Sequence, residues 1–205
     1  MVKRLTLLHT SPVHVPVFDA LREQDHPEAA LRHLVAPELL DRARAHGPGA
    51  VVEDLLARLR GADGPVLVTC STIGAVAESL APALGVPVLR VDRPMAAEAV
   101  RIGPRVAVLA TVESTLAPTA ELLAEVAAGR PVSVRTHLVD GAWALFEAGD
   151  DAGSAAAVAA AADSVTDADV IVLAQASMVG AVPLVRTRLP VLTSPRRGLA
   201  AGMSL

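Results

Sequence analysis

The chain has 205 residues, a formal net charge of −4 at pH 7 and 52% hydrophobic residues, which is typical of a folded protein rather than a disordered one. Phe18, Trp143 and Phe146 are its only Phe, Trp or Tyr residues, so it lacks both the aromatic side chains and the basic balance of a nucleic-acid-binding protein. The single cysteine excludes an internal disulfide framework and is typical of a reducing compartment.

Short apolar runs alternate along the chain with longer stretches that read as helices. Continuous apolar runs are typical of parallel strands covered on both faces, and their alternation with helices indicates an α/β fold with right-handed crossovers. We predict strands over Arg4–His9, Val66–Thr69, Val86–Val91, Arg105–Ala110, Val132–Leu138, Val170–Ala174 and Pro190–Leu192. We predict helices over Phe18–Gln24, Pro37–His46, Gly49–Arg60, Gly74–Leu84, Met95–Ile102, Pro118–Ala128, Ala142–Ala148, Gly153–Val165 and Val179–Arg188.

Two segments have an apolar character that raises the question of membrane insertion or export. The amino-terminal segment is interrupted by His9, His14 and Asp19 too early for a signal peptide. The alanine-rich run 154–162 is too short to span a bilayer, and acidic residues follow it at once. We therefore expect a soluble, cytoplasmic protein that binds neither membranes nor nucleic acids.

Three strand-and-loop segments of the first half recur in the same order in the second half. Residues 66–75 match residues 172–181, 5–11 resemble 106–111, and 87–92 resemble 190–195. One such match carries little weight, because α/β proteins often reuse such strands and loops, but three in register favour an internal duplication. We predict two pseudo-symmetric lobes, 1–93 and 94–189, around one ligand cleft, with the tail 190–205 packing on the first lobe.

The predicted strands end in small hydroxylic residues. In open α/β sheets, ligands bind beyond the carboxyl ends of the strands, where helix starts present free N–H groups that suit a carboxylate. A single Ser or Thr at such a place could equally cap a helix, and it is the whole set that favours ligand binding. The set predicted to line the site is Ser11, Ser71, Thr72, Thr111, Ser114, Thr115, Ala176 and Ser177.

Cys70 is the sharpest candidate for chemistry, because it stands between a predicted strand and a predicted helix. The start of a helix favours the thiolate, which could act as an acid, a base or a nucleophile. The alternative is a buried cysteine that packs as a small apolar side chain. The six histidines show no metal-ligand spacing and no glycine-rich phosphate loop follows a strand, so we expect neither a metal nor a cofactor.

The motifs together resemble those of the aspartate/glutamate racemase superfamily, which includes aspartate, glutamate and hydantoin racemases, maleate isomerase and arylmalonate decarboxylase. The resemblance covers nearly the whole chain and implies two pseudo-symmetric α/β lobes, a cofactor-independent enzyme and a possible homodimer. The matching pieces are residues 8–12, 69–74, 89–95, 109–111 and 173–178.

The resemblance also implies residue roles. Cys70 matches the first catalytic cysteine of the family, and Ser11 lies in a first loop that often carries an acidic or polar group. The remaining matches are Ser71 and Thr72 as carboxylate-binding neighbours, Thr111 as a substrate-binding threonine, and Ser114 or Thr115 as a second one. The departure is in the second lobe, where Ala176 replaces the second cysteine and Met178 stands where a histidine is often found.

The missing cysteine limits the reactions that the chain could perform. Racemisation by two opposed acid/base groups needs a proton carrier on each face, and the side chain of Ala176 cannot carry one. A single thiol suits protonation of a carbanion after decarboxylation. In the one-cysteine decarboxylases of the superfamily, however, the cysteine corresponds to the second-lobe position, so this chain would be a mirror arrangement. A single thiol also suits addition to a double bond, as in maleate isomerases.

We therefore expect an isomerase- or racemase-like enzyme that uses Cys70 on a small carboxylic acid. The alternatives are a decarboxylase of the same superfamily and a non-catalytic carboxylate-binding protein that lost its second cysteine. A purely structural or interaction protein ranks last, because it leaves the hydroxylic set unexplained.

Overall fold

The computed structural model describes residues 2–205, and the chain forms two compact units. The first unit contains the residues up to Asp92 together with Pro195–Leu205, and the second contains Arg93–Ser194. The carboxyl-terminal segment thus belongs to the same unit as the amino-terminal strands.

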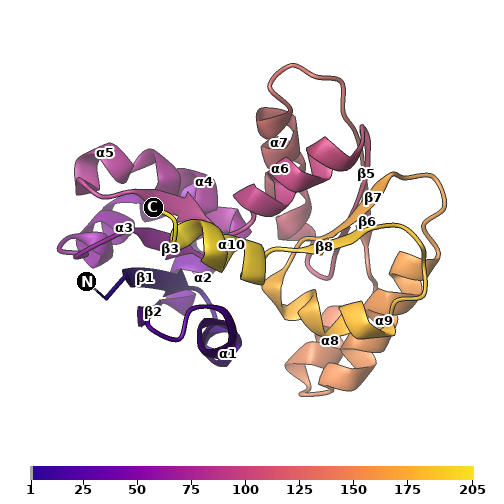
Figure 1. Ribbon diagram of the computed structural model, residues 1–205, viewed down its shortest axis with the longest axis horizontal. Helices are drawn as coiled ribbons and strands as arrows, with labels where there is room; N and C mark the ends of the chain where they lie inside the picture. The colour runs from indigo at the N-terminus through magenta and orange to yellow at the C-terminus, as the bar shows by residue number, and fades with distance from the viewer. Residues whose placement is uncertain (1) are drawn as a thin grey trace. The chain divides into compact units, whose positions relative to one another are not determined.

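The first unit is built on a parallel four-stranded sheet with the order β2-β1-β3-β4 (Figure 1). The central strands β1 and β3 are buried almost throughout, as continuous apolar runs in parallel sheets usually are. The strands are β1 (Arg4–His9), β2 (Ala30–Val35), β3 (Val66–Val68) and β4 (Val88–Arg90).

Helices cover both faces of this first sheet. Phe18 of α1 and Leu199 of α10 pack with Leu5 and Leu7 on one face, and in Figure 1 the yellow helix α10 lies beside α1 and β3. The other face packs against the remaining helices of the unit. The helices are α1 (His14–Asp25), α2 (Pro37–His46), the 3₁₀ helix η1 (Pro48–Val51), α3 (Val52–Leu59), α4 (Ser71–Ser79), α5 (Ala81–Leu84) and α10 (Pro195–Gly202).

The second unit repeats the plan with a parallel sheet in the order β6-β5-β7-β8. Its strands are β5 (Arg105–Ala110), β6 (Ser133–Leu138), β7 (Val170–Leu173) and β8 (Val191–Thr193). The helices α6 (Arg93–Ile102) and α7 (Leu116–Ala127) cover one face, and α8 (Ala142–Glu147), α9 (Asp151–Asp163) and the 3₁₀ helix η3 (Ala176–Leu184) cover the other. A short 3₁₀ helix, η2 (Glu113–Thr115), precedes α7.

The two sheets share one strand order, with β1 corresponding to β5 and β3 to β7. The sequence prediction of an α/β fold with two mainly parallel, helix-flanked sheets is confirmed. None of the helices within residues 2–205 is long and apolar enough to cross a membrane.

Several element boundaries differ from those that the sequence predicts. Strand β2 was not predicted, because Arg32 and His33 interrupt its apolar residues and, as an edge strand, it is only partly buried. Helix α10 was also not predicted. The predicted helix Val179–Arg188 is instead a 3₁₀ helix that begins earlier and contains Pro183, which lacks the N–H that an α-helix interior needs.

Candidate functional site

Cys70 follows Thr69, the first residue after β3, and is the N-cap residue of α4, with an extended backbone (φ −118°, ψ 118°). No side chain caps the start of this helix, and the first N–H groups of an α-helix have no partner inside it. Cys70 is 8% exposed and belongs to the aliphatic cluster that contains Leu8 and Ile73. Cys70 thus lies in a mostly apolar environment at the positive end of a helix dipole.

The other residues predicted in the first unit lie at the same edge of the sheet. Ser71 and Thr72 form the first turn of α4, and Ser11 follows β1, where its carbonyl accepts a hydrogen bond from the His14 N–H at 3.5 Å. All three are half-buried. Because β1 and β3 are parallel neighbours, their carboxyl ends place Ser11 and Cys70 on one side of this unit.

The predicted residues of the second unit gather at the corresponding edge of its own sheet. Thr111 follows β5, Ala176 and Ser177 begin η3 after β7, and these two strands are parallel neighbours. Thr115 is buried and its carbonyl accepts a hydrogen bond from the Thr119 hydroxyl at 2.8 Å. The Ala176 side chain is 4% exposed and offers no acid or base.

Gln175 is a site residue that the sequence analysis does not single out. Its side-chain oxygen accepts hydrogen bonds from the Thr111 N–H at 2.6 Å, the Thr111 hydroxyl at 3.1 Å and the Val112 N–H at 3.3 Å. These are donors of the loop that the sequence predicts to hold a carboxylate. In this structure, an oxygen from the chain itself occupies them.

Each unit also contains a buried polar atom without a hydrogen-bond partner among the described residues. These atoms are Nδ1 of His14 in the first unit and Oγ of Ser114 in the second. Both belong to the segment that follows the first strand of their sheet. Unpaired buried polar atoms are rare in folded proteins, and a bound ligand or water is a common reason for them. Burial lowers the pKa of His14, which favours the neutral imidazole.

A chain of hydrogen bonds joins two histidines to the residue before Cys70. The Nδ1 atom of fully buried His9 lies 2.8 Å from the Thr69 hydroxyl oxygen, and its Nε2 lies 2.8 Å from Nδ1 of His33. Nε2 of His33 lies 3.2 Å from a carboxylate oxygen of Asp19. Burial, with smaller contributions from nearby His33 and His14, lowers the pKa of His9 to about 3.

The structure places His9, at the carboxyl end of β1, inside the protein. The pairing could not be read from the sequence, because His33 lies on β2, the strand that was not predicted. Within residues 2–205, no group of three or more His, Cys, Asp or Glu side chains is arranged to hold a metal ion.

A buried ion pair lies behind the first turns of α4. Arg90 donates to both carboxylate oxygens of Asp92, at 2.7 and 2.8 Å, and the two side chains are only 2% and 1% exposed. The backbone N–H of Arg90 donates to Glu78 on α4. Gly74 lies directly against this pair, because a Cβ atom built there would approach the Arg90 Cβ to 2.9 Å.

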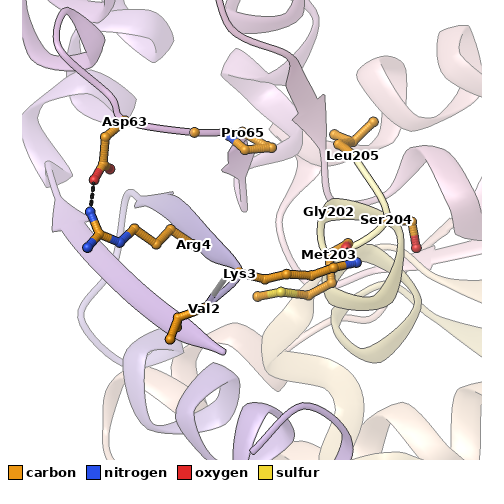
Figure 2. A pocket seen from close by; sticks show the side chains of 10 residues that line it. Val2, Lys3, Arg4, Asp63, Pro65, Gly202, Met203, Ser204 and Leu205 are labelled. Carbon is orange, nitrogen blue, oxygen red and sulfur yellow. Dashed lines mark hydrogen bonds and ion pairs between the residues drawn. The ribbon is translucent and has the colours of Figure 1, made fainter. Parts of the chain in front are cut away.

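The first unit has a cavity of about 710 Å³ at the opposite end of its strands from Cys70. Figure 2 shows Arg4 paired with Asp63 on one side of it and Lys3 reaching toward the end of α10, where its ammonium donates to the Met203 carbonyl at 2.8 Å. The lining contains no nucleophilic cysteine or histidine. Cys70 and the other predicted site residues of this unit therefore lie away from this cavity.

Comparisons with known proteins identify the family of the chain. Residues 19–200 match the model of the family described as Asp/Glu/hydantoin racemase. No curated protein sequence matches the chain significantly.

Solved structures share the fold at low sequence identity. A Yersinia pestis protein, identified only provisionally as an Asp/Glu racemase, has a TM-score of 0.71 and 14% identity, with 99% of this chain and 98% of that one covered. Allantoin racemase from Klebsiella pneumoniae has a TM-score of 0.68 and 19% identity, with 99% and 87% covered. A variant of arylmalonate decarboxylase has a TM-score of 0.66 and 19% identity, with 98% and 92% covered. The resemblance read from the motifs is confirmed: the chain belongs to the Asp/Glu/hydantoin racemase family.

Proposed function

We propose that this protein is a cofactor-independent enzyme that acts on a small carboxylic acid, with Cys70 as its acid, base or nucleophile. The observation that carries the proposal is the position of Cys70 at the uncapped start of α4, beyond the carboxyl end of a central strand. The first N–H groups of a helix and its dipole attract negative charge in general. Membership in a family whose structural neighbours are racemases and a decarboxylase supports an enzyme rather than a structural protein.

The same elements would hold the substrate. The first N–H groups of α4 and the half-buried hydroxyls of Ser71 and Thr72 suit one carboxylate, as helix starts do for anions in general. Arg90 does not supply a free positive charge for this purpose, because Asp92 binds its guanidinium group in a bidentate pair. In the second unit, the unpaired hydroxyl of Ser114 supports a role for that loop in binding as well. Such donors would also stabilise the enolate-like intermediate of carbanion chemistry.

Ala176 supports a proposal about the type of reaction. Where a two-base racemase would need its second proton carrier, this chain has a buried methyl group. We therefore propose chemistry that needs one thiol. The thiol could protonate a carbanion left by the loss of carbon dioxide, or it could add to a double bond and leave again after rotation about the resulting single bond. Two-base racemisation is the least favoured of the reactions known in the family.

Ala176 also favours a second candidate function, namely a carboxylate-binding protein without catalytic activity. In that case the Cys70 thiol would have no need to react at neutral pH. Iodoacetamide labelling as a function of pH separates the two functions. A labelling midpoint near the ordinary thiol value of about 8.5 would favour binding, and a lower midpoint would favour catalysis.

Turnover by the Cys70→Ser and Cys70→Ala variants tests the proposal directly. The substrates to offer are aspartate, glutamate, allantoin, maleate and arylmalonate, followed by proton NMR in deuterium oxide. Exchange at Cα, double-bond isomerisation and loss of carbon dioxide each give a distinct spectrum. Once a substrate is found, we expect both variants to lose about 100-fold or more of the activity, the usual contribution of a positioned acid/base or nucleophile.

The matched control is Ser79→Ala, at the far end of the same helix, where the exposed hydroxyl donates to the Val76 carbonyl at 2.6 Å. This variant should keep wild-type turnover. Thermal unfolding of all three variants separates a lost reaction from a lost fold. Wild-type activity in the Cys70 variants would rule out the proposed role.

A further inference from the structure

We propose that Asp19, His33, His9 and Thr69 form a positioning chain for the Cys70 loop, and that one proton sets the direction of its hydrogen bonds. This chain of hydrogen bonds begins at Asp19 of α1, whose side chain is 45% exposed, and continues to His33 of β2, whose side chain is 15% exposed. It ends inside the protein, at His9 and Thr69. It crosses three neighbouring elements of the sheet, β2, β1 and the end of β3.

The end of the chain is fixed to the residue before Cys70. The Thr69 hydroxyl lies 2.8 Å from Nδ1 of His9 and 3.2 Å from the Leu8 carbonyl oxygen, and the Thr69 N–H donates to the same carbonyl at 2.9 Å. His9 therefore contacts the point where β3 leaves the sheet and α4 begins. Packing of His9 against Phe18, with ring centroids 5.6 Å apart, holds the imidazole in place from the side of α1.

Two arrangements of protons satisfy the observed distances. With His33 neutral, Thr69 donates to Nδ1 of His9, Nε2–H of His9 donates to His33, and Nε2–H of His33 donates to Asp19. The Leu8 carbonyl then accepts a hydrogen bond from the Thr69 N–H but not from the Thr69 hydroxyl.

With one more proton, His33 is doubly protonated and donates to both Asp19 and His9. His9 then donates from Nδ1 to the Thr69 oxygen, and Thr69 donates to the Leu8 carbonyl. This second arrangement accounts for every hydrogen bond observed from Asp19 to the Leu8 carbonyl. No bond between heavy atoms changes, and the extra proton comes from solvent.

His9 stays singly protonated in both arrangements, and only the nitrogen that carries the proton changes. The low pKa of His9 agrees with this, because a buried imidazole with a neighbouring histidine on each side resists a second proton. The titratable groups that contact His33 are Asp19 from α1, at 3.2 Å, and His9 from β1, at 2.8 Å, and His14 of α1 lies near His9. Thr69 of the next strand carries no charge, and β2 is the edge strand, so its other side has no strand neighbour.

Long-range ¹H–¹⁵N NMR of the ¹⁵N-labelled full chain tests the switch. We expect the His9 proton on Nδ1 at the acidic end of the titration and on Nε2 at the alkaline end, as the two arrangements require. Asp19→Asn should change the proportion of the two His9 tautomers at a given pH, because it removes the carboxylate to which His33 donates in both arrangements. His46→Gln, at an exposed position on α2, should leave it unchanged. A single His9 tautomer from pH 5 to pH 8 would overturn the switch.

The effect on Cys70 is tested by the pH profile of its alkylation by iodoacetamide. Thr69→Val removes the hydroxyl at similar size, and we expect it to move the profile or change the rate at least threefold, whereas Thr69→Ser should restore wild-type behaviour. A Thr69→Val profile that coincides with the wild type would overturn the positioning role. The link to catalysis rests on the proposed function, but neither readout requires turnover. A failure here is therefore distinguishable from a Cys70 variant that remains fully active.

Discussion

The side-chain oxygen of Gln175 lies 2.6 Å from the backbone nitrogen of Thr111 and 3.1 Å from its hydroxyl oxygen. This contact joins the loops that follow the neighbouring strands β5 and β7. An amide oxygen thereby occupies donors that the sequence predicts to hold a carboxylate. Any ligand that uses Thr111 must displace Gln175 or bind beside it.

Replacing Gln175 should reveal what this contact contributes to the second unit. We expect Gln175→Ala to lower the free energy of unfolding by about 1–2 kcal/mol, because the mostly buried N–H groups of Thr111 and Val112 lose their acceptor. Gln175→Glu keeps an acceptor and should lose less. Urea unfolding of the three proteins measures the difference. Equal stability of the alanine variant and the wild type would mean that other acceptors replace Gln175.

Gly74 and Gly180 are equivalent in the sequence repeat but differ in their surroundings, which makes them a matched pair. A Cβ at Gly74 would lie 2.9 Å from the Arg90 Cβ and 3.2 Å from its Nε, whereas a Cβ at Gly180 would lie 3.8 Å from the Ala155 Cβ. We expect Gly74→Ala to destabilise by about 1–3 kcal/mol, as overpacking does. Gly180→Ala should be close to neutral. Thermal unfolding of both variants checks the difference, and equal effects would contradict the model of close packing at Gly74.

The buried Arg90–Asp92 pair should be far more sensitive to mutation than an exposed one. Asp92→Ala leaves the Arg90 guanidinium in a site that is only 2% exposed, and we expect a loss of about 3–5 kcal/mol. The control is Asp63→Ala, which breaks the solvent-exposed pair with Arg4 and should cost far less stability than Asp92→Ala. Denaturant unfolding measures both values. Similar losses in the two variants would show that burial does not decide the contribution of the Asp92 pair.

The parts of the fold that the sequence predicts are those with a strong local signal. The runs Arg4–His9 and Arg105–Ala110 are apolar almost throughout, because buried parallel strands contact helices on both faces, and both are strands with the predicted bounds. The repeat of residues 66–75 correctly indicates two sheets of one topology. Strand β2 has no continuous apolar run, because it is only partly buried. It is a strand because it pairs with β1 along its whole length.

The candidate site is predicted less completely, for a related reason. Cys70 could be placed at a strand-to-helix junction from its neighbours in the sequence alone. Gln175 and His33 act through partners 64 and 24 residues away, and such pairings depend on which strands lie side by side. The sequence around His9 does not indicate that this side chain is buried, because histidine is only intermediate in its tendency to be buried. Its burial follows from Phe18 and His33, which pack against it from α1 and β2.

Acid should destabilise the protein over a pH range that His9 defines. The pKa of His9 is about 3 in the folded chain and about 6.5 when unfolded, so below pH 6.5 the unfolded state binds the additional proton. The contribution of neutral His9 is therefore complete above pH 6.5, and stability should fall by roughly 1.4 kcal/mol per pH unit below it. Buried His14, whose pKa is also lowered, acts in the same direction.

Urea unfolding at pH 7 and pH 4.5 measures this loss, and His9→Gln should reduce the difference between the two values, because glutamine does not titrate. The pKa values of Asp63 and Asp169 are lowered by hydrogen bonds from Arg4 and Arg105, so their protonation belongs to more acidic solutions and does not obscure the result. His46→Gln serves as the control, because His46 is exposed and its loss should leave the acid sensitivity as it is. Equal stability of the wild type at the two pH values would contradict the assignment of a buried, neutral His9.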